Sequence, residues 1–308
     1  MARQIIDIDT VQPNGKKGDP ARLMSQKING NFEELYGSVS GLAAVGGDNM
    51  LINCGVPINQ RGFAGGALAA GAYGYDRWKA GTGGCNVTIN ATTGVFTHTS
   101  GPLQQIVEAP QLAWGQPLTI SVENPSGSIS VSVGGATGTI TAGSGRRGIT
   151  LTPSGSGNMT VQLTASGVTY ARPKLERGSA ASPFVARPQA LEVALCQRYY
   201  QVEKVGDNGT SRLNLVNGFF QNSTTFYGLY QYPKMRAVPS VGITPASAWR
   251  ILIGNSAVNV NTIVAAEISI NRFTLIVTCP AVTAGSGGQV QTVDSPPAGA
   301  GLYLDAEL

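Results

Sequence analysis

The chain has 308 residues, of which 12% are charged, 42% are hydrophobic and 41 are glycine. That length accommodates about two domains with cores of their own, and the low charge with ample hydrophobic content argues against a disordered chain. The net charge of +4 is spread thinly, and its densest pairs, Lys16-Lys17 and Arg146-Arg147, fall short of the basic runs of nucleic-acid-binding segments. We therefore expect a folded, glycine-rich β protein that binds no nucleic acid.

The sequence carries no sign of export, membrane insertion or metal binding. Its first residues lack the apolar stretch of a secretory signal, and no run of about 18 apolar residues follows. We therefore expect a protein that is made in a cytosol and is not inserted into a membrane. Zinc sites need clustered thiolates and imidazoles, whereas this chain has one histidine and four widely spaced cysteines. We expect no metal, and buried, reduced thiols at Cys54, Cys85, Cys196 and Cys279.

The first predicted element is a helix that starts after Gly18. Asp19 as N-cap and Pro20 at the first helical position predict its start, and the sequence to Tyr36 is compatible with a helix. The apolar residues of this stretch form a short, imperfect heptad pattern, and a single helix cannot bury such a stripe by itself. We expect the helix to pack on its own domain or, preferably, on copies of itself. The apolar stripe comprises Met24, Ile28, Phe32, Leu35 and Leu42.

Short runs that alternate apolar and polar residues occupy the chain from about Gly83 to Phe184. Alternate side chains of a strand point to opposite faces, so each run predicts a strand with one buried face. Glycine-rich turns separate the runs, and strands of about five residues at this spacing favour an antiparallel sandwich. The predicted strands cover residues 87–89, 118–122, 129–133, 149–151 and 159–163.

A short helical stretch after Pro188 precedes a second β-rich segment. Leu191 and Leu195 lie four residues apart there, as on one helix face. The final strand places Leu302, Leu304, Ala306 and Leu308 on one face, so we expect it to dock rather than to form a loose tail. The predicted strands of this segment cover residues 213–216, 226–232, 251–253, 267–277 and 302–308.

Motifs that carry enzymatic chemistry are weak. Gly143–Gly148 matches G-x-G-x-x-G, but it lies between two predicted strands and indicates a glycine hairpin instead of a dinucleotide site. His98 occupies a polar position of a predicted strand, and no G-x-S-x-G elbow accompanies it. We therefore predict no enzyme, no catalytic residues and no cofactor.

Glycoside hydrolysis is the enzymatic alternative. It requires two carboxyl groups about 5–9.5 Å apart, and no repeat of the kind that builds a long β-helix is present. Glu267 alone lies inside an apolar run, and the sequence does not pair it with a second acid. The acids available in the distal segment are Glu203, Asp207, Glu267, Asp294, Asp305 and Glu307.

Aromatic residues gather in the second β-rich segment. In a strand over residues 226–232, Phe226, Tyr230 and Tyr232 share one face and Tyr227 lies on the other. One face is expected to be core, and the other offers flat rings with polar tips that suit sugar or protein surfaces. The predicted receptor contacts are Tyr227, Tyr230, Trp249 and Arg250.

Several stretches resemble one family in order along nearly the whole chain, although none is specific by itself. They resemble bacteriophage tail fibres, which are receptor-binding tail proteins with a carbohydrate-binding-module-like jelly roll. Residues 54–57 lack the acid that holds a structural calcium in related modules, so no metal site is inferred. The matching stretches are residues 18–22, 27–32, 49–53, 58–62, 75–78, 174–179, 182–184, 192–200, 235–240 and 305–308.

The resemblance implies a mainly β virion protein with a short N-terminal helix, assembled as a homotrimer. Residues 1–46 would be the tail-attachment segment, 47–187 a jelly-roll β-sandwich, and 188–308 a C-terminal β-sandwich-like receptor-binding domain. The implied partners are phage tail tip or baseplate proteins and a host cell-surface polysaccharide or pilus. The protein would be made in the host cytoplasm and carried on the phage tail. A polysaccharide-degrading tailspike and a purely structural baseplate spacer are the alternatives.

The apolar helix stripe and the resemblance together predict a stable homotrimer. Light scattering of the purified chain should give three times 31.8 kDa. A monodisperse monomer at micromolar concentration would contradict this assembly.

Overall fold

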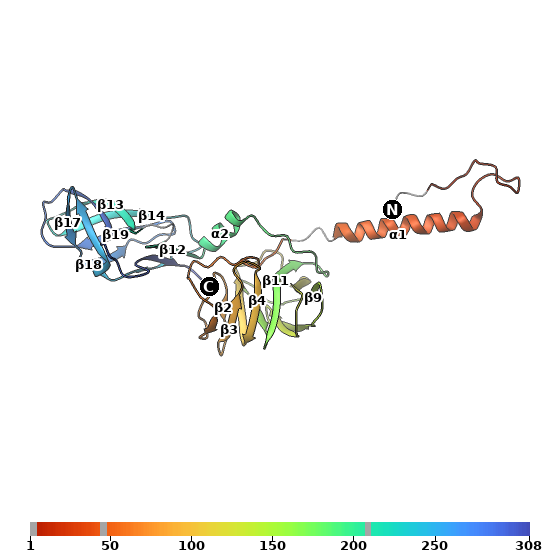
Figure 1. Ribbon diagram of the computed structural model, residues 1–308, viewed down its shortest axis with the longest axis horizontal. Helices are drawn as coiled ribbons and strands as arrows, with labels where there is room; N and C mark the ends of the chain where they lie inside the picture. The colour runs from red at the N-terminus through yellow and green to blue at the C-terminus, as the bar shows by residue number, and fades with distance from the viewer. Residues whose placement is uncertain (1–4, 44–47, 207–210) are drawn as a thin grey trace.

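The computed structural model describes residues 5–43, 48–206 and 211–308, and these residues form a mainly β protein (Figure 1). A long helix, α1 (Ala21–Ala43), lies apart from two β regions that follow it in the chain. We call residues 48–187 the first β region and residues 188–308 the second β region. Each encloses its own cluster of buried hydrophobic residues.

Helix α1 is longer than the sequence predicted and begins differently. It starts at Ala21 and has 23 residues. The predicted cap, Asp19, instead accepts hydrogen bonds from the backbone N–H of Asp7 at 2.9 Å and from Lys27 Nζ at 2.7 Å. The Lys27 ammonium group thereby lowers the pKa of Asp19. Asp19 therefore ties the preceding segment to the helix.

The first β region consists of two antiparallel sheets that share one core. Their inward faces follow the alternation expected from the sequence, so that Ile129, Val131 and Val133 are all buried. One sheet has the order β1-β3-β4-β11-β6-β9 and the other β2-β5-β10-β7-β8. The strands are β1 (Gly66–Leu68), β2 (Lys79–Ala80), β3 (Cys85–Ile89), β4 (Val95–Ser100), β5 (Pro102–Val107), β6 (Leu118–Glu123), β7 (Ile129–Val133), β8 (Ala136–Ile140), β9 (Arg146–Leu151), β10 (Met159–Thr164) and β11 (Val168–Arg177). All five runs predicted here lie within strands of this region.

Two local predictions in the first β region were wrong. The Gly143–Gly148 loop is not a hairpin, because it joins β8 in one sheet to β9 in the other. His98 is fully buried, since β4 turns it toward the core together with Phe96. Its Nδ1 lies 3.1 Å from Tyr170 Oη and its Nε2 lies 2.7 Å from the carbonyl of Gly101. Burial lowers the pKa of His98, which is therefore a core residue with both ring nitrogens partnered.

The second β region begins with α2 (Gln189–Gln197) and contains a three-stranded and a seven-stranded sheet. The three-stranded sheet has the order β12-β21-β15, and the larger sheet has the order β17-β16-β20-β13-β14-β19-β18. The strands are β12 (Tyr200–Lys204), β13 (Asn214–Phe220), β14 (Thr225–Gln231), β15 (Ser240–Ile243), β16 (Trp249–Ile253), β17 (Ser256–Asn259), β18 (Thr262–Ala266), β19 (Arg272–Thr278), β20 (Gly287–Thr292) and β21 (Gly301–Asp305), with a 3₁₀ turn at Ala246–Ala248.

The predicted strand over residues 267–277 is too long at its start. Glu267 has a φ of +51° and lies in the turn between β18 and β19, because a left-handed residue interrupts an extended strand. The predicted helix after Pro188 is confirmed. The final strand docks as predicted, but it ends at Asp305 and not at Leu308. Leu302, Leu304 and Ala306 are buried together as expected.

A buried arginine joins the two β regions. The Arg77 side chain is 1% exposed and forms an ion pair with Glu307. Its guanidinium carbon lies 3.4 Å from the ring centroid of Tyr199, and its Nη2 donates to the carbonyl of Ile106. These contacts hold the residues after β21 against the first β region.

Neighbouring contacts reinforce this attachment. Arg61 stacks 3.7 Å from the ring centroid of Tyr200 and approaches Asp305 at 3.3 Å. The carbonyl of Leu308 accepts hydrogen bonds from Lys79 Nζ at 2.8 Å and from the Tyr73 hydroxyl. The last residues of the chain therefore connect the two β regions.

Replacing Arg77 by alanine should lower the free energy of unfolding by about 3–5 kcal/mol, because it removes the guanidinium group that pairs with the buried Glu307 carboxylate. Arg172→Ala is the control, since the Arg172 side chain is 48% exposed beside Glu123 and should cost no more than about 1 kcal/mol. Urea denaturation followed by tryptophan fluorescence measures both. Equal losses in the two variants would show that the Arg77 contacts contribute no more to stability than an exposed ion pair does.

Candidate functional site

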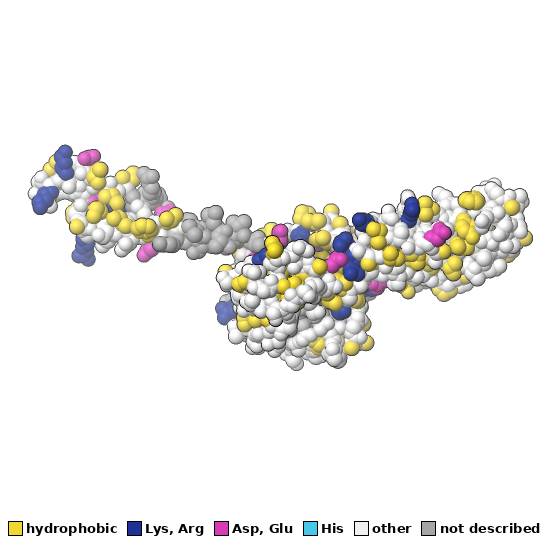
Figure 2. Space-filling view, turned by 180° about the vertical axis from the view of Figure 1, so that it is seen from behind, with side chains coloured by type: hydrophobic (Ala, Val, Ile, Leu, Met, Phe, Trp, Pro, Cys, Tyr) yellow, Lys and Arg dark blue, Asp and Glu magenta, His cyan; other side chains and the backbone are white. Residues whose placement is uncertain are grey.

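Tyr227 lies on the outward face of the seven-stranded sheet. The register aligns Phe219 with Tyr227, Tyr227 with Ile276, and Ile276 with Val264 across four neighbouring strands. Phe219 and Val264 are 56% and 51% exposed, and Leu229 on the same face is 52% exposed. We call these five residues the outward row. Figure 2 shows few charged side chains over the far end of this region.

Two of the predicted receptor contacts are core residues. Trp249 is 1% exposed, and its Nε1 donates to the carbonyl of Thr244 at 3.1 Å. Tyr230 is 8% exposed and stacks on Phe273 with ring centroids 5.1 Å apart. Both point inward because the three-stranded sheet and its connections cover that face. Trp249 and Tyr230 therefore pack in the core of the second β region.

Arg250, the remaining candidate, is held in an ion-pair cluster. Its two terminal nitrogens donate to the Asp294 carboxylate at 2.8 and 2.7 Å, and Arg212 also pairs with Asp294. The hydrogen bond from Arg250 lowers the pKa of Asp294. Strands β20 and β13 separate Arg250 on β16 from Tyr227 on β14. The structure therefore does not bring the four candidates into one site.

A polar pocket lies between β12 and β21 on one side and the end of β14 on the other. Its volume is about 190 Å³. We call it the tyrosine pocket, because two tyrosine rings, 6.1 Å apart and tilted by 33°, form part of its wall. Its lining residues are Gln197, Gln201, Val202, Glu203, Tyr230, Gln231, Tyr232, Pro233, Leu302 and Leu304.

The polar groups of the tyrosine pocket are held in place by the backbone. Gln201 Nε2 donates to the carbonyls of Gln197 and Pro233, both at 3.0 Å, which orients its amide. The Tyr232 hydroxyl donates to the carbonyl of Ser269. Burial, followed by the nearby Glu203 carboxylate, raises the pKa of Tyr230 well above its ordinary value. The pocket thus combines neutral aromatic hydroxyls, amides and one carboxylate.

Of the acids considered for glycoside hydrolysis, Asp305 and Glu307 both lie beside Arg61, at 3.3 and 3.5 Å from its terminal nitrogens. Asp294, Asp305 and Glu307 pair with arginines, and Glu267 accepts a hydrogen bond from Thr274 at 2.8 Å on an exposed turn. Glu203 is the one carboxylate residue that lines the tyrosine pocket. Asp207 lies outside the described residues.

All four cysteines are free and buried, as predicted. No group of three or more His, Cys, Asp or Glu residues placed to hold a metal ion is found among the described residues. No helix in the described ranges has the length and hydropathy that a membrane span requires.

The predicted helix stripe is largely exposed. Met24, Phe32 and Leu35 are 38%, 51% and 54% exposed, and Ile28 is half-buried. The side chain of Leu42 lies outside the described residues. The described part of the stripe thus leaves large apolar side chains accessible along α1, where a second helix can cover them.

Sequence reasoning named Tyr230, Tyr232 and Glu203 but missed Gln201 and Gln231, and it did not bring these residues into one pocket. Gln201 and Glu203 follow the Tyr199-Tyr200 pair in the chain, but Gln231 lies about thirty residues further along. A signal was present in β12 and β14, where polar residues end aromatic strands. Neither segment by itself predicts that these strand ends, which belong to two different sheets, lie next to each other.

No protein-family model matches the sequence, and no curated protein matches it either. Any functional assignment therefore depends on the ordered sequence motifs and on the geometry of the described residues.

Replacing Trp249 by alanine should lower the free energy of unfolding by about 3–5 kcal/mol, because it removes a fully buried aromatic side chain. Tyr227→Ala, on the outward row, should change it by about 0.5 kcal/mol or less. Urea denaturation compares the two variants. A large loss for Tyr227→Ala would mean that the outward row is already covered in solution.

Proposed function

We propose that this chain is a structural protein of a bacteriophage tail, a tail fibre, whose second β region binds a saccharide of the host-cell surface in the tyrosine pocket. The ordered motifs at the two ends and at the junction support this assignment. The spatial order supports it too, because α1 lies at one end of the molecule and the second β region at the other (Figure 1).

In this proposal the three parts have different roles. The segment with α1 attaches to tail tip or baseplate proteins and associates with two further copies through its apolar stripe. The first β region is the carbohydrate-binding-module-like jelly roll, which connects attachment and receptor binding. Three receptor sites in one trimer raise avidity by roughly 10²–10⁴-fold over one site, so a shallow, weak pocket is sufficient.

The observation that carries the proposal is the chemistry of the tyrosine pocket. Glu203 and Gln231 supply exposed hydrogen-bonding groups, and Gln201 lines the same wall. Tyr230 and Tyr232 are core residues that contribute only the small accessible part of their rings, 8% each. Sugars present apolar C–H faces and a rim of hydroxyls, which this combination of groups complements. A pilus or other protein surface would use the outward row instead, because aliphatic side chains suit protein–protein contacts.

Binding without hydrolysis fits this pocket better than a tailspike activity. Glycoside hydrolysis uses two carboxyl groups flanking the scissile bond, and the lining residues include Glu203 as their one acid. We therefore propose an adhesion protein with no catalytic residues.

Glu203→Gln combined with Gln231→Ala should abolish binding of the purified chain to bacterial surface polysaccharides, because both changed side chains are exposed at the pocket and supply hydrogen bonds. The melting temperature should stay unchanged for the same reason. Glu33→Gln, which changes an exposed acid on α1, is the matched control and should bind normally. A panel of immobilised polysaccharides provides the measurement.

Three other outcomes would each contradict saccharide binding in the tyrosine pocket and indicate a different function. Shortening of the polysaccharide by the wild-type chain, seen by sizing of the products, would establish a tailspike. Loss of adsorption with Tyr227→Ala but not with the pocket variant would move the receptor contact to the outward row. Failure to bind any surface polymer or pilus would favour a structural spacer.

A further inference from the structure

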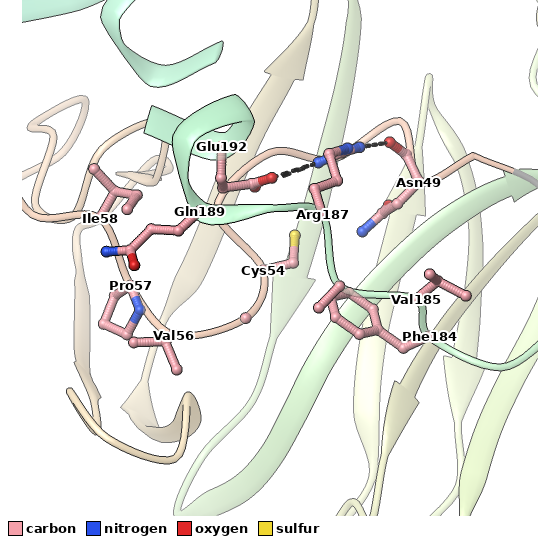
Figure 3. A pocket seen from close by; sticks show the side chains of 12 residues that line it. Asn49, Cys54, Val56, Pro57, Ile58, Phe184, Val185, Arg187, Gln189 and Glu192 are labelled. Atoms are coloured by element: carbon pink, nitrogen blue, oxygen red, sulfur yellow. Dashed lines mark hydrogen bonds and ion pairs between the residues drawn. The ribbon is translucent and has the colours of Figure 1, made fainter. Parts of the chain in front are cut away.

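A second cavity lies at the junction of the first β region and the start of α2. Its volume is about 320 Å³, and it shares no residue with the tyrosine pocket. We call it the junction cavity. Figure 3 shows its lining side chains, which come from the loop after Asn49, from the segment after β11 and from the first turn of α2.

The facing walls of the junction cavity are apolar. Val56, Pro57 and Ile58 form one wall, and Phe184 and Val185 form the opposite one (Figure 3). Val56 and Val185 are 55% and 70% exposed, so they lie at the open rim. An apolar guest that enters between these walls buries apolar surface against both of them, and each square ångström buried contributes about 25 cal/mol.

The inner end of the cavity is also neutral. The Cys54 thiol lies there, with a side chain that is 1% exposed. Burial raises the pKa of this thiol, and the nearby Glu192 carboxylate raises it further. The thiol is therefore protonated at neutral pH and behaves as a small apolar group.

The charged groups of the cavity satisfy each other. Arg187 Nη1 lies 3.0 Å from Glu192 Oε2, and Arg187 also donates to the carbonyls of Asn49 and Leu51. Glu192 accepts a hydrogen bond from the backbone N–H of Asn53. These contacts bind α2 to the 49–53 segment and fix the separation of the two walls without a ligand. Because the two charges pair with each other, neither is free to pair with a charged ligand.

Gln189 supplies the polar group at the mouth. Its side chain is exposed, lines the cavity and makes no contact marked in Figure 3 with the other residues drawn there. An amide both donates and accepts a hydrogen bond. It can therefore pair with a single donor or acceptor on a ligand without requiring a charge.

We propose that the junction cavity binds a small, neutral, largely apolar molecule with one hydrogen-bonding group, which the Gln189 amide recognises. The volume lies at the lower end of the range of about 300–1,000 Å³ for ligand pockets, which suits a bicyclic aromatic molecule the size of indole. A charged analogue is excluded because burying an ion without a partner is strongly unfavourable. This site is independent of the proposed saccharide binding.

Calorimetric titration of the full chain with indole tests the proposal. Indole should bind, and indole-3-acetate should bind at least tenfold more weakly because of its charge. Val185→Trp should weaken indole binding at least tenfold by filling the mouth. Val238→Trp is the matched control, because Val238 is also an exposed valine, 57% accessible, in the second β region, and it should leave binding unchanged.

The Gln189 contact has its own readout. Wild-type protein should prefer indole to 1-methylindole, which lacks the N–H donor, and Gln189→Leu should remove that preference while 1-methylindole still binds. Absence of binding by wild-type protein at millimolar indole would overturn the proposal. So would equal binding by the wild type and Val185→Trp, or equal weakening by Val185→Trp and Val238→Trp. If the tyrosine-pocket variant loses saccharide binding but still binds indole, the junction cavity is supported as a separate site.

Discussion

The relative position of the two β regions depends on the burial of one charge, the Arg77 guanidinium. A buried ion is tolerated only when charge and hydrogen-bonding partners replace water. Glu307 supplies the countercharge, Tyr199 the ring face and Ile106 a carbonyl. Glu307 follows β21, the central strand of the three-stranded sheet. The chain therefore returns from the second β region to the first and secures their junction.

Helix α2 connects this junction to both pockets. Gln189 and Glu192, in its first half, line the junction cavity, and Gln197, its last residue, lines the tyrosine pocket. The two pockets nevertheless differ in chemistry. In the junction cavity the Arg187–Glu192 pair neutralises the charges and leaves apolar walls, whereas in the tyrosine pocket amide, hydroxyl and carboxylate groups remain at the wall. One short helix thus borders an apolar cavity and a polar one.

The outward row and the stripe of α1 leave apolar side chains exposed in a molecule with few surface charges. Exposed apolar surface of this kind is typical of proteins that contact another surface. In the proposed tail fibre, copies of the chain cover the stripe, and the outward row is available to a second partner. The ion-pair cluster of Arg212, Arg250 and Asp294 lies beside the same sheet and sets two guanidinium groups against one carboxylate.

The sequence by itself determined the β class, most strands, the helix after Pro188 and the docking of the final strand, because alternation and helix starts are local properties. It also placed Phe226, Tyr230 and Tyr232 on one face. Only the tertiary structure decided that this face is core, since that depends on the sheet that covers it. The same holds for the burial of His98 and Trp249. Arg77 meets Glu307 across 230 positions. Each pocket likewise joins segments that lie far apart in the sequence. No local pattern encodes such contacts, so the packing of the two β regions determines them.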